Sequence, residues 1–250
     1  ARGVFFSSIN AILNVILQLT MVSCGQVVQA DARKSPLPSE TTPIWFTDPP
    51  YYDAIPYSDL SDFFFVWFKR TLLGHPLLHD SYDINNALTP KRMEIVQDET
   101  KKDNGQTKDK VWFEGMMAKA FSEGRRVLNN EGIGSVVFAH KTTEGWEALL
   151  SGLIHGGWII TGSWPIATES SARLRARDSA ALATSVHLVC RPRPEDAPIG
   201  DWGEVLRELP QRVGKWMGYL QEQGIRGADL VFACIGPALE IYSRFPQVET

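Results

Sequence analysis

The chain has 250 residues and a mass of 27.9 kDa, with 44% hydrophobic and 22% charged residues. These proportions are ordinary for a globular protein and exclude a disordered chain, a collagen and a coiled-coil rod. Lys and Arg number 25 against 29 Asp and Glu, a net charge of −4, so any DNA contact must come from a local basic patch. Three cysteines lie far apart with no CxxC, which predicts no disulfide framework or zinc ribbon and a reducing, cytoplasmic location.

The first predicted element is a helix that covers residues 11–22. This stretch is apolar enough to suggest a signal peptide, but Asn10, Asn14 and Gln18 recur every four residues and form a polar stripe. The stripe indicates an amphipathic helix that is too short and too polar to span a bilayer. We therefore expect no membrane segment here.

The remaining elements alternate between short strands and helices, which predicts an α/β fold. A Rossmann-like core with a mixed, mostly parallel sheet is expected over residues 1–199, and a helical extension over residues 200–250. The expected strands are residues 26–29, 43–47, 134–139, 158–164 and 185–191. The expected helices are residues 60–73, 112–128 (closed by residues 129–132), 143–155 and 202–220 (kinked or restarted at Pro210), with one or two short helices in 227–244. Residues 79–110 are polar and predict a mobile, solvated loop.

Asp48-Pro49-Pro50-Tyr51 is the most informative motif, because it directly follows a predicted strand. Open α/β sheets bind ligands at the carboxyl ends of their strands. The Asp48 side chain and the Pro49 carbonyl together offer two acceptors for an exocyclic NH2 group, and the Tyr51 ring offers a face on which an extruded base can stack. Two other interpretations stay open: a plain turn, or an exposed PPxY ligand for WW domains at residues 49–52.

This motif resembles motif IV of the S-adenosylmethionine-dependent DNA amino-methyltransferases. Residues 48–65 are similar to one subgroup, the large adenine-specific DNA methylases of bacteria and archaea, and the similarity extends to residues 137–141, 162–166, 185–191 and 233–240. The resemblance implies that Asp48, Pro49, Pro50 and Tyr51 are catalytic. It also implies that Tyr52 and Tyr57 line the base pocket.

The resemblance further implies S-adenosylmethionine as cofactor and DNA as partner. Asp31 and Asp48 are the expected cofactor-binding residues, with Asp31 as an alternative turn-capping residue. Three arginines at alternate positions are expected to bind DNA phosphates: Arg173, Arg175 and Arg177. The alternative is that they lie exposed on a solvated hairpin. His140 and Lys141 end a strand and either face the pocket or form a solvated loop pair.

The sequence departs from the family in one respect, since it contains no Gly-rich cofactor turn. In the subgroup this turn lies well before motif IV, so the chain resembles a C-terminal catalytic fragment, whose partner is the preceding part of the same protein. No metal site is predicted, because Gly74 and Pro76 prevent a helix from presenting His75 and His79 together. The expected function is methylation of adenine in DNA. The alternatives are a cytosine amino-methyltransferase and a non-catalytic DNA- or partner-binding module with a degenerate pocket.

Overall fold

The computed structural model describes residues 2–18, 25–167 and 184–249, which fall into two compact units, 1–30 and 31–250. The first unit contains α1 (Arg2–Gln18), so the predicted opening helix is confirmed with earlier bounds. The strand predicted at residues 26–29 is wrong: these residues are irregular and exposed, and none of the described strands pairs with them. None of the helices in the described ranges is long and apolar enough to cross a bilayer.

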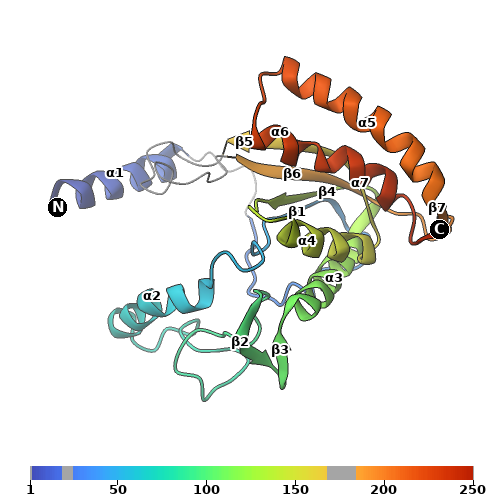
Figure 1. Ribbon diagram of the computed structural model, residues 1–250. Coiled ribbons are helices and arrows are strands. Elements are labelled where there is room, and N and C mark those ends of the chain that lie inside the picture. Colours follow the sequence, from blue (N-terminus) through green and yellow to red (C-terminus); the bar gives the residue numbers. More distant parts are fainter. Residues whose placement is uncertain (1, 19–24, 168–183, 250) are drawn as a thin grey trace. The chain divides into compact units, whose positions relative to one another are not determined.

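The second unit is built on a four-stranded mixed sheet (Figure 1). Its strands are β1 (Thr42–Thr47), β4 (Leu128–Phe138), β5 (Trp158–Ala167) and β6 (Thr184–Pro192), in the spatial order β1-β4-β6-β5. β1 is parallel to β4, and β6 is antiparallel to both β4 and β5. Three strands therefore run in one direction, and the predicted mixed α/β fold is confirmed at this level.

One face of the sheet is covered by helices and carries the core. These helices are α3 (Lys110–Val127), α4 (Thr143–His155), α6 (Ala228–Ala233) and α7 (Ile235–Ser243). Trp45 of β1 stacks on Trp158 of β5 with 5.1 Å between ring centroids, and meets Phe121 of α3 edge-on at 6.0 Å. Because aromatic side chains bury large apolar areas, these contacts tie β1 to the rest of the unit.

The opposite face of the sheet is partly open. Strand pairing places Ile44, Phe46, Ile133, Trp164 and Ile166 on this face, and all five are exposed. Trp164 contacts two aromatic rings of α5 (Trp202–Glu222), which runs through Pro210 without interruption. The restart predicted at Pro210 is therefore wrong, and the alternative of a kink there stays a prediction. The sheet face nearest β1 is apolar and largely solvated.

Residues 79–110 are more ordered than their composition predicts. They include the hairpin of β2 (Asp98–Asp103) and β3 (Gln106–Lys108), and side-chain hydrogen bonds link them to α2 (Tyr57–Thr71). Lys108 is almost fully buried because its Nζ donates to the carbonyls of Lys91 and Glu94, each at 2.7 Å. The prediction of a solvated loop is wrong here, since buried polar groups stay inside only when they are bonded.

The residues that follow α3 differ from the prediction as well. Residues 129–132 were expected to close the helix, but they belong to β4, which starts at Leu128. In the C-terminal part, the two short helices predicted in residues 227–244 are confirmed as α6 and α7. A two-residue strand on each side, β7 (Gly200–Asp201) and β8 (Val248–Glu249), pairs the two ends of this part. The expected boundary at residue 199 stays a prediction.

Candidate active site

The predicted motif lies at the carboxyl end of β1. Asp48 directly follows the strand, and the neighbouring parallel strand β4 ends at Phe138. The loops that leave these two strands meet, because His140 Nε2 lies 3.0 Å from Asp53 Oδ1. The structure therefore brings the motif to the sheet edge where open α/β sheets bind their ligands.

The four motif residues differ in exposure. Asp48 is exposed, Pro49 is buried, and Pro50 and Tyr51 are half-buried. The ring of Tyr51 meets Phe138 edge-on, with 5.3 Å between centroids. Burial raises the pKa of Tyr51 to about 12, and the Asp48 carboxylate beside its hydroxyl adds to this rise. Asp48 and Tyr51 are thus neighbours at the surface, and Tyr51 is neither fully free nor fully enclosed.

Tyr57 belongs to the same group of side chains. It is exposed at the start of α2, and its pKa is raised by partial burial and then by the nearby Asp48 carboxylate. Tyr57 therefore lies near Asp48, and its expected role in lining the base pocket stays a prediction.

Tyr52 has a different environment from its neighbour. It is only 4% exposed, its hydroxyl donates to Glu144 Oε1 at 3.1 Å, and its ring meets Phe113 edge-on at 5.1 Å. Its φ of +56° is in the left-handed region, which is uncommon for a residue other than glycine. These contacts anchor the loop to the core, and the side chains of Tyr51 and Tyr52 lie in different environments. The expected role of Tyr52 in lining the base pocket stays a prediction.

His140 and Asp53 form a link that the sequence did not reveal. His140 is 5% exposed; its Nδ1 accepts from the Thr142 backbone N–H at 3.2 Å, so Nε2 carries the proton that it donates to Asp53. Trp146 Nε1 donates to the His140 carbonyl at 2.9 Å. The solvated-pair interpretation is therefore wrong for His140, whereas Lys141 is exposed and its two predicted alternatives stay predictions.

Asp31, the other expected cofactor residue, is already bound by a neighbour. Arg33 Nη2 and Nε donate to its carboxylate at 2.8 and 2.9 Å. The hydrogen bonds from Arg33 hold the pKa of Asp31 below its usual value. Asp31 lines a cavity of about 640 Å³ on the side of α3 that also carries Lys119 and Arg126. Asp31 shares none of the described contacts of the Asp48 motif.

The described ranges contain no cluster of three or more His, Cys, Asp or Glu side chains suited to a metal ion. A cavity of about 330 Å³ adjoins the motif loop; it is lined by Asp53, Pro56, Val96, Gln97, Asp98 and Glu99. The three arginines expected to hold phosphates, Arg173, Arg175 and Arg177, lie outside the described residues.

Comparison with known proteins adds no family assignment, since neither a protein-family model nor a curated protein matches the chain. Three groups lie at one edge of the sheet: the exposed Asp48 carboxylate, the backbone carbonyl of Pro49 (a residue that has no backbone N–H) and the Tyr51 ring. Such a set can accept hydrogen bonds from an amino group and pack against a flat ring.

Proposed function

We propose that this chain forms the target-base side of an S-adenosylmethionine-dependent methyltransferase that acts on the exocyclic amine of adenine in DNA. The observation that carries the proposal is the placement of exposed Asp48 beside half-buried Tyr51 at the carboxyl end of β1. The resemblance of the motif to amino-methyltransferases supplies the reaction class. The parallel pair β1 and β4, with the antiparallel β6 beyond it, is compatible with a Rossmann-like methyltransferase core.

In this proposal Asp48 and Pro49 orient the amine. The two N–H groups of the amine donate to the Asp48 carboxylate and to the Pro49 carbonyl. Both donors then point toward the protein, so the nitrogen lone pair points toward the methyl donor. The Tyr51 ring stacks on the face of the base, and base–aromatic stacking contributes about 1–3 kcal/mol. This gain is comparable to the cost of unstacking the base from a duplex.

The described residues do not by themselves form a site for S-adenosylmethionine. When bound, this cofactor supplies a methyl group already activated on a sulfonium. Arg33 occupies the Asp31 carboxylate, and the sequence contains no Gly-rich turn. We therefore assign to this chain the binding and orientation of the base, and we assign cofactor binding to a segment that carries such a turn.

Discrimination between adenine and purine tests the orienting role of Asp48. Duplexes that carry adenine, cytosine or amine-free purine at one mismatched position are titrated with the chain. We expect adenine to bind about 10- to 100-fold more tightly than purine, because hydrogen bonds to a charged acceptor contribute about 1.5–3 kcal/mol. Asp48→Ala should remove this preference and change non-specific affinity little, since phosphate contacts dominate it.

Glu131→Ala removes an exposed carboxylate at the other end of the sheet, near the start of β4, and should preserve the preference for adenine. An unchanged preference in Asp48→Ala would refute the assignment. A preference for cytosine over adenine would identify the other amino-methyltransferase.

A non-catalytic binding module is favoured by one observation, the occupied carboxylate of Asp31. Calorimetry of S-adenosylmethionine binding separates the two functions. Base discrimination without cofactor binding, both in this chain and in any longer form of the protein, would indicate a binding module. Cofactor binding by the longer form would support the enzyme.

A further inference from the structure

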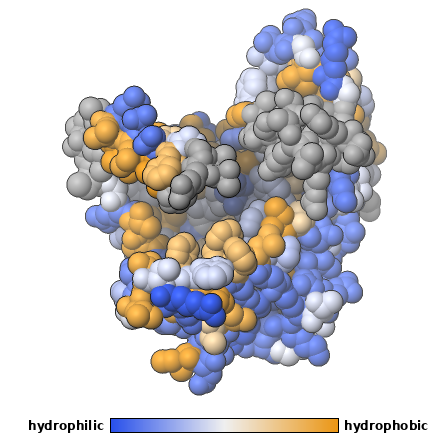
Figure 2. Space-filling view, turned by 90° about the vertical axis from the view of Figure 1, so that its left-hand side faces the viewer, coloured by the Kyte–Doolittle hydropathy of each residue, from blue (hydrophilic) through white to orange (hydrophobic). Residues whose placement is uncertain are grey.

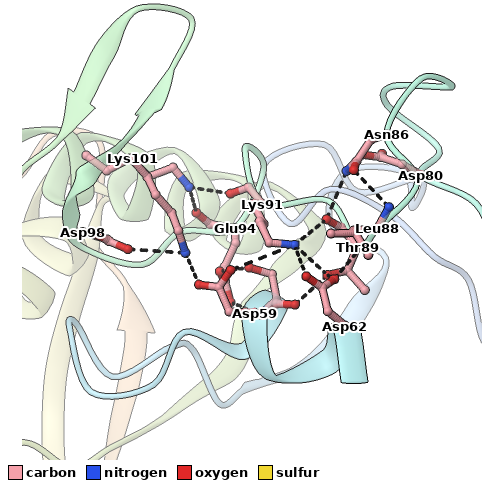
Figure 3. Close-up of polar contacts among 12 residues, drawn as sticks. Asp59, Asp62, Asp80, Asn86, Leu88, Thr89, Lys91, Glu94, Asp98 and Lys101 are labelled. Carbon is pink, nitrogen blue, oxygen red and sulfur yellow. Dashed lines mark hydrogen bonds and ion pairs between the residues drawn. The ribbon is translucent and has the colours of Figure 1, made fainter. Parts of the chain in front are cut away.

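Helix α2 binds to the rest of its unit through its polar side. Ser58 donates to Glu94 through its backbone N–H at 2.9 Å and through its hydroxyl at 2.5 Å. Asp62 accepts from Lys91 Nζ at 2.6 Å and from the Thr89 backbone N–H at 3.0 Å (Figure 3). These bonds hold the polar side of the helix against residues 89–94.

The opposite side of α2 is apolar and faces solvent. Phe63 is 65% exposed and Trp67 is 52% exposed. The exposed apolar residues recur at helical spacing and form one face, here called the α2 stripe: Leu60, Phe63, Phe64, Trp67 and Phe68. Figure 2 shows hydrophobic side chains gathered on the side of the molecule that carries α2. An amphipathic helix normally buries its apolar face, so the orientation of α2 indicates a surface that another molecule covers.

The charges beside the α2 stripe indicate what covers it. Asp59 lies in the first turn of α2 and Arg70 in the last. They are 11 residues apart, about three helical turns, so both lie on the same side of the stripe. Residues 64 and 65 lie midway between them and near the middle of the stripe. In an antiparallel pair of identical helices centred there, Asp59 of each copy lies beside Arg70 of the other.

We propose that the protein forms a two-fold symmetric dimer in which the α2 stripe packs antiparallel against the α2 stripe of a second copy. A two-fold axis buries the same patch on both copies, as this self-complementary charge pattern requires. Asp59, although bound by Lys101, keeps 40% of its side chain exposed for a second partner. The proposal concerns association and does not rest on the proposed reaction.

The area of the stripe is sufficient for a specific interface. An aromatic side chain buries about 150–250 Å² when fully enclosed, so five large side chains that are about half exposed provide roughly 500 Å² per copy. Both copies together then bury about 1,000 Å², the lower limit for a specific interface. We therefore expect a weak dimer, in the micromolar range.

Sedimentation velocity of the whole chain over a range of concentrations tests the dimer. The weight-average mass should rise from 27.9 kDa toward twice that value. Trp67→Glu should weaken association more than about 100-fold, because aromatic residues at the centre of an interface dominate its energy. Ile84→Glu, at a loop position that is 90% exposed, is the matched control and should leave association unchanged.

A charge exchange tests the antiparallel orientation. Arg70→Asp and Asp59→Arg should each weaken the dimer about 3- to 10-fold, since each replaces two attractive pairs by repulsive ones. The double variant should restore the dimer to within about two-fold of the parent. In a parallel dimer the double variant would show no such rescue, which would overturn the proposed arrangement.

Three other outcomes would overturn the dimer itself. The chain could remain monomeric at about 0.1 mM, where an interface of this size should form. Association could survive Trp67→Glu and be lost in Phe46→Glu, which would place the interface on the open sheet face. A monomer that binds anionic vesicles or single-stranded oligonucleotides through Trp67 would assign the α2 stripe to a different partner.

Discussion

Replacing Asp62 with alanine tests how α2 is held in place. The substitution removes the bond to Lys91 and leaves the Thr89 backbone N–H without its acceptor, whereas the Thr89 hydroxyl keeps the Ser58 carbonyl at 2.6 Å. Because a lost hydrogen bond to a charged group costs about 1.5–3 kcal/mol, we expect a destabilisation of about 2–3 kcal/mol. For a unit of this size the melting temperature should fall by about 5–10 °C. Hydrogen exchange should show faster exchange of α2 amides than of the sheet.

The effect of Asp62→Ala should depend on pH. Burial alone would raise the pKa of Asp62, but the hydrogen bonds from Lys91 and Thr89 outweigh burial and lower it below 3.8. The carboxylate therefore stabilises the folded state fully above pH 3.8, and this contribution is lost as the pH falls through the lower folded value. The stability difference between parent and variant should be constant from pH 7 to 5 and shrink in stronger acid.

Asp59→Ala serves as the control for the same helix. Asp59 is bound by Lys101 but is more exposed than Asp62, 40% against 20%, so its loss should cost less than about 1 kcal/mol. If Asp62→Ala cost no more than Asp59→Ala, or if α2 exchange were unchanged, the bonds to Thr89 and Lys91 would not hold the helix and the reasoning would be refuted.

Substitutions at Tyr51, Gly145 and Lys108 have measurable outcomes. Tyr51→Phe should keep base binding, whereas Tyr51→Ala should weaken it about 10- to 100-fold. The fluorescence of 2-aminopurine at the target position measures stacking and should brighten in Tyr51→Ala, which lacks the stacking ring. An unchanged fluorescence with a large fall in melting temperature would show that Tyr51 is a core residue. Gly145→Ala should lower stability by about 1–3 kcal/mol in urea unfolding, because a Cβ there overlaps the His140 ring, whereas Gly218→Ala on α5 meets no atom within 4 Å and should be neutral or stabilising. Lys108→Met should cost about 1–3 kcal/mol by leaving two carbonyls without a donor, and a neutral result would show that water replaces the ammonium.

Local patterns in the sequence predicted the elements around the site. The strand at residues 43–47 and the helix at residues 143–155 were identified by apolar runs bounded by polar and glycine residues, and both are confirmed. The motif position after β1 followed from the same reasoning. The prediction worked because these elements bury a continuous apolar face, which the sequence displays directly.

The links between distant segments could not be predicted in this way. His140 and Asp53 are 87 residues apart, and each looks like an ordinary polar loop residue. Lys108 resembles the other lysines in its segment, yet only this one is buried, because two carbonyls from residues 91 and 94 converge on it. The left-handed backbone of Tyr52 likewise depends on tertiary contacts that oppose local preference.

The position of β1 at the edge of the sheet affects how the chain behaves at high concentration. Among the described strands, β1 pairs with β4 alone, so its outer backbone groups are available to any extended segment. Pro43 has no N–H and protects one position, but Ile44 and Phe46 beyond it are exposed and alternate as a pairing strand requires. Main-chain pairing needs little sequence match, so ordered aggregation should nucleate at β1. Crowding during synthesis would favour this aggregation. Covering the outer edge of β1 would therefore keep the protein soluble at high concentration.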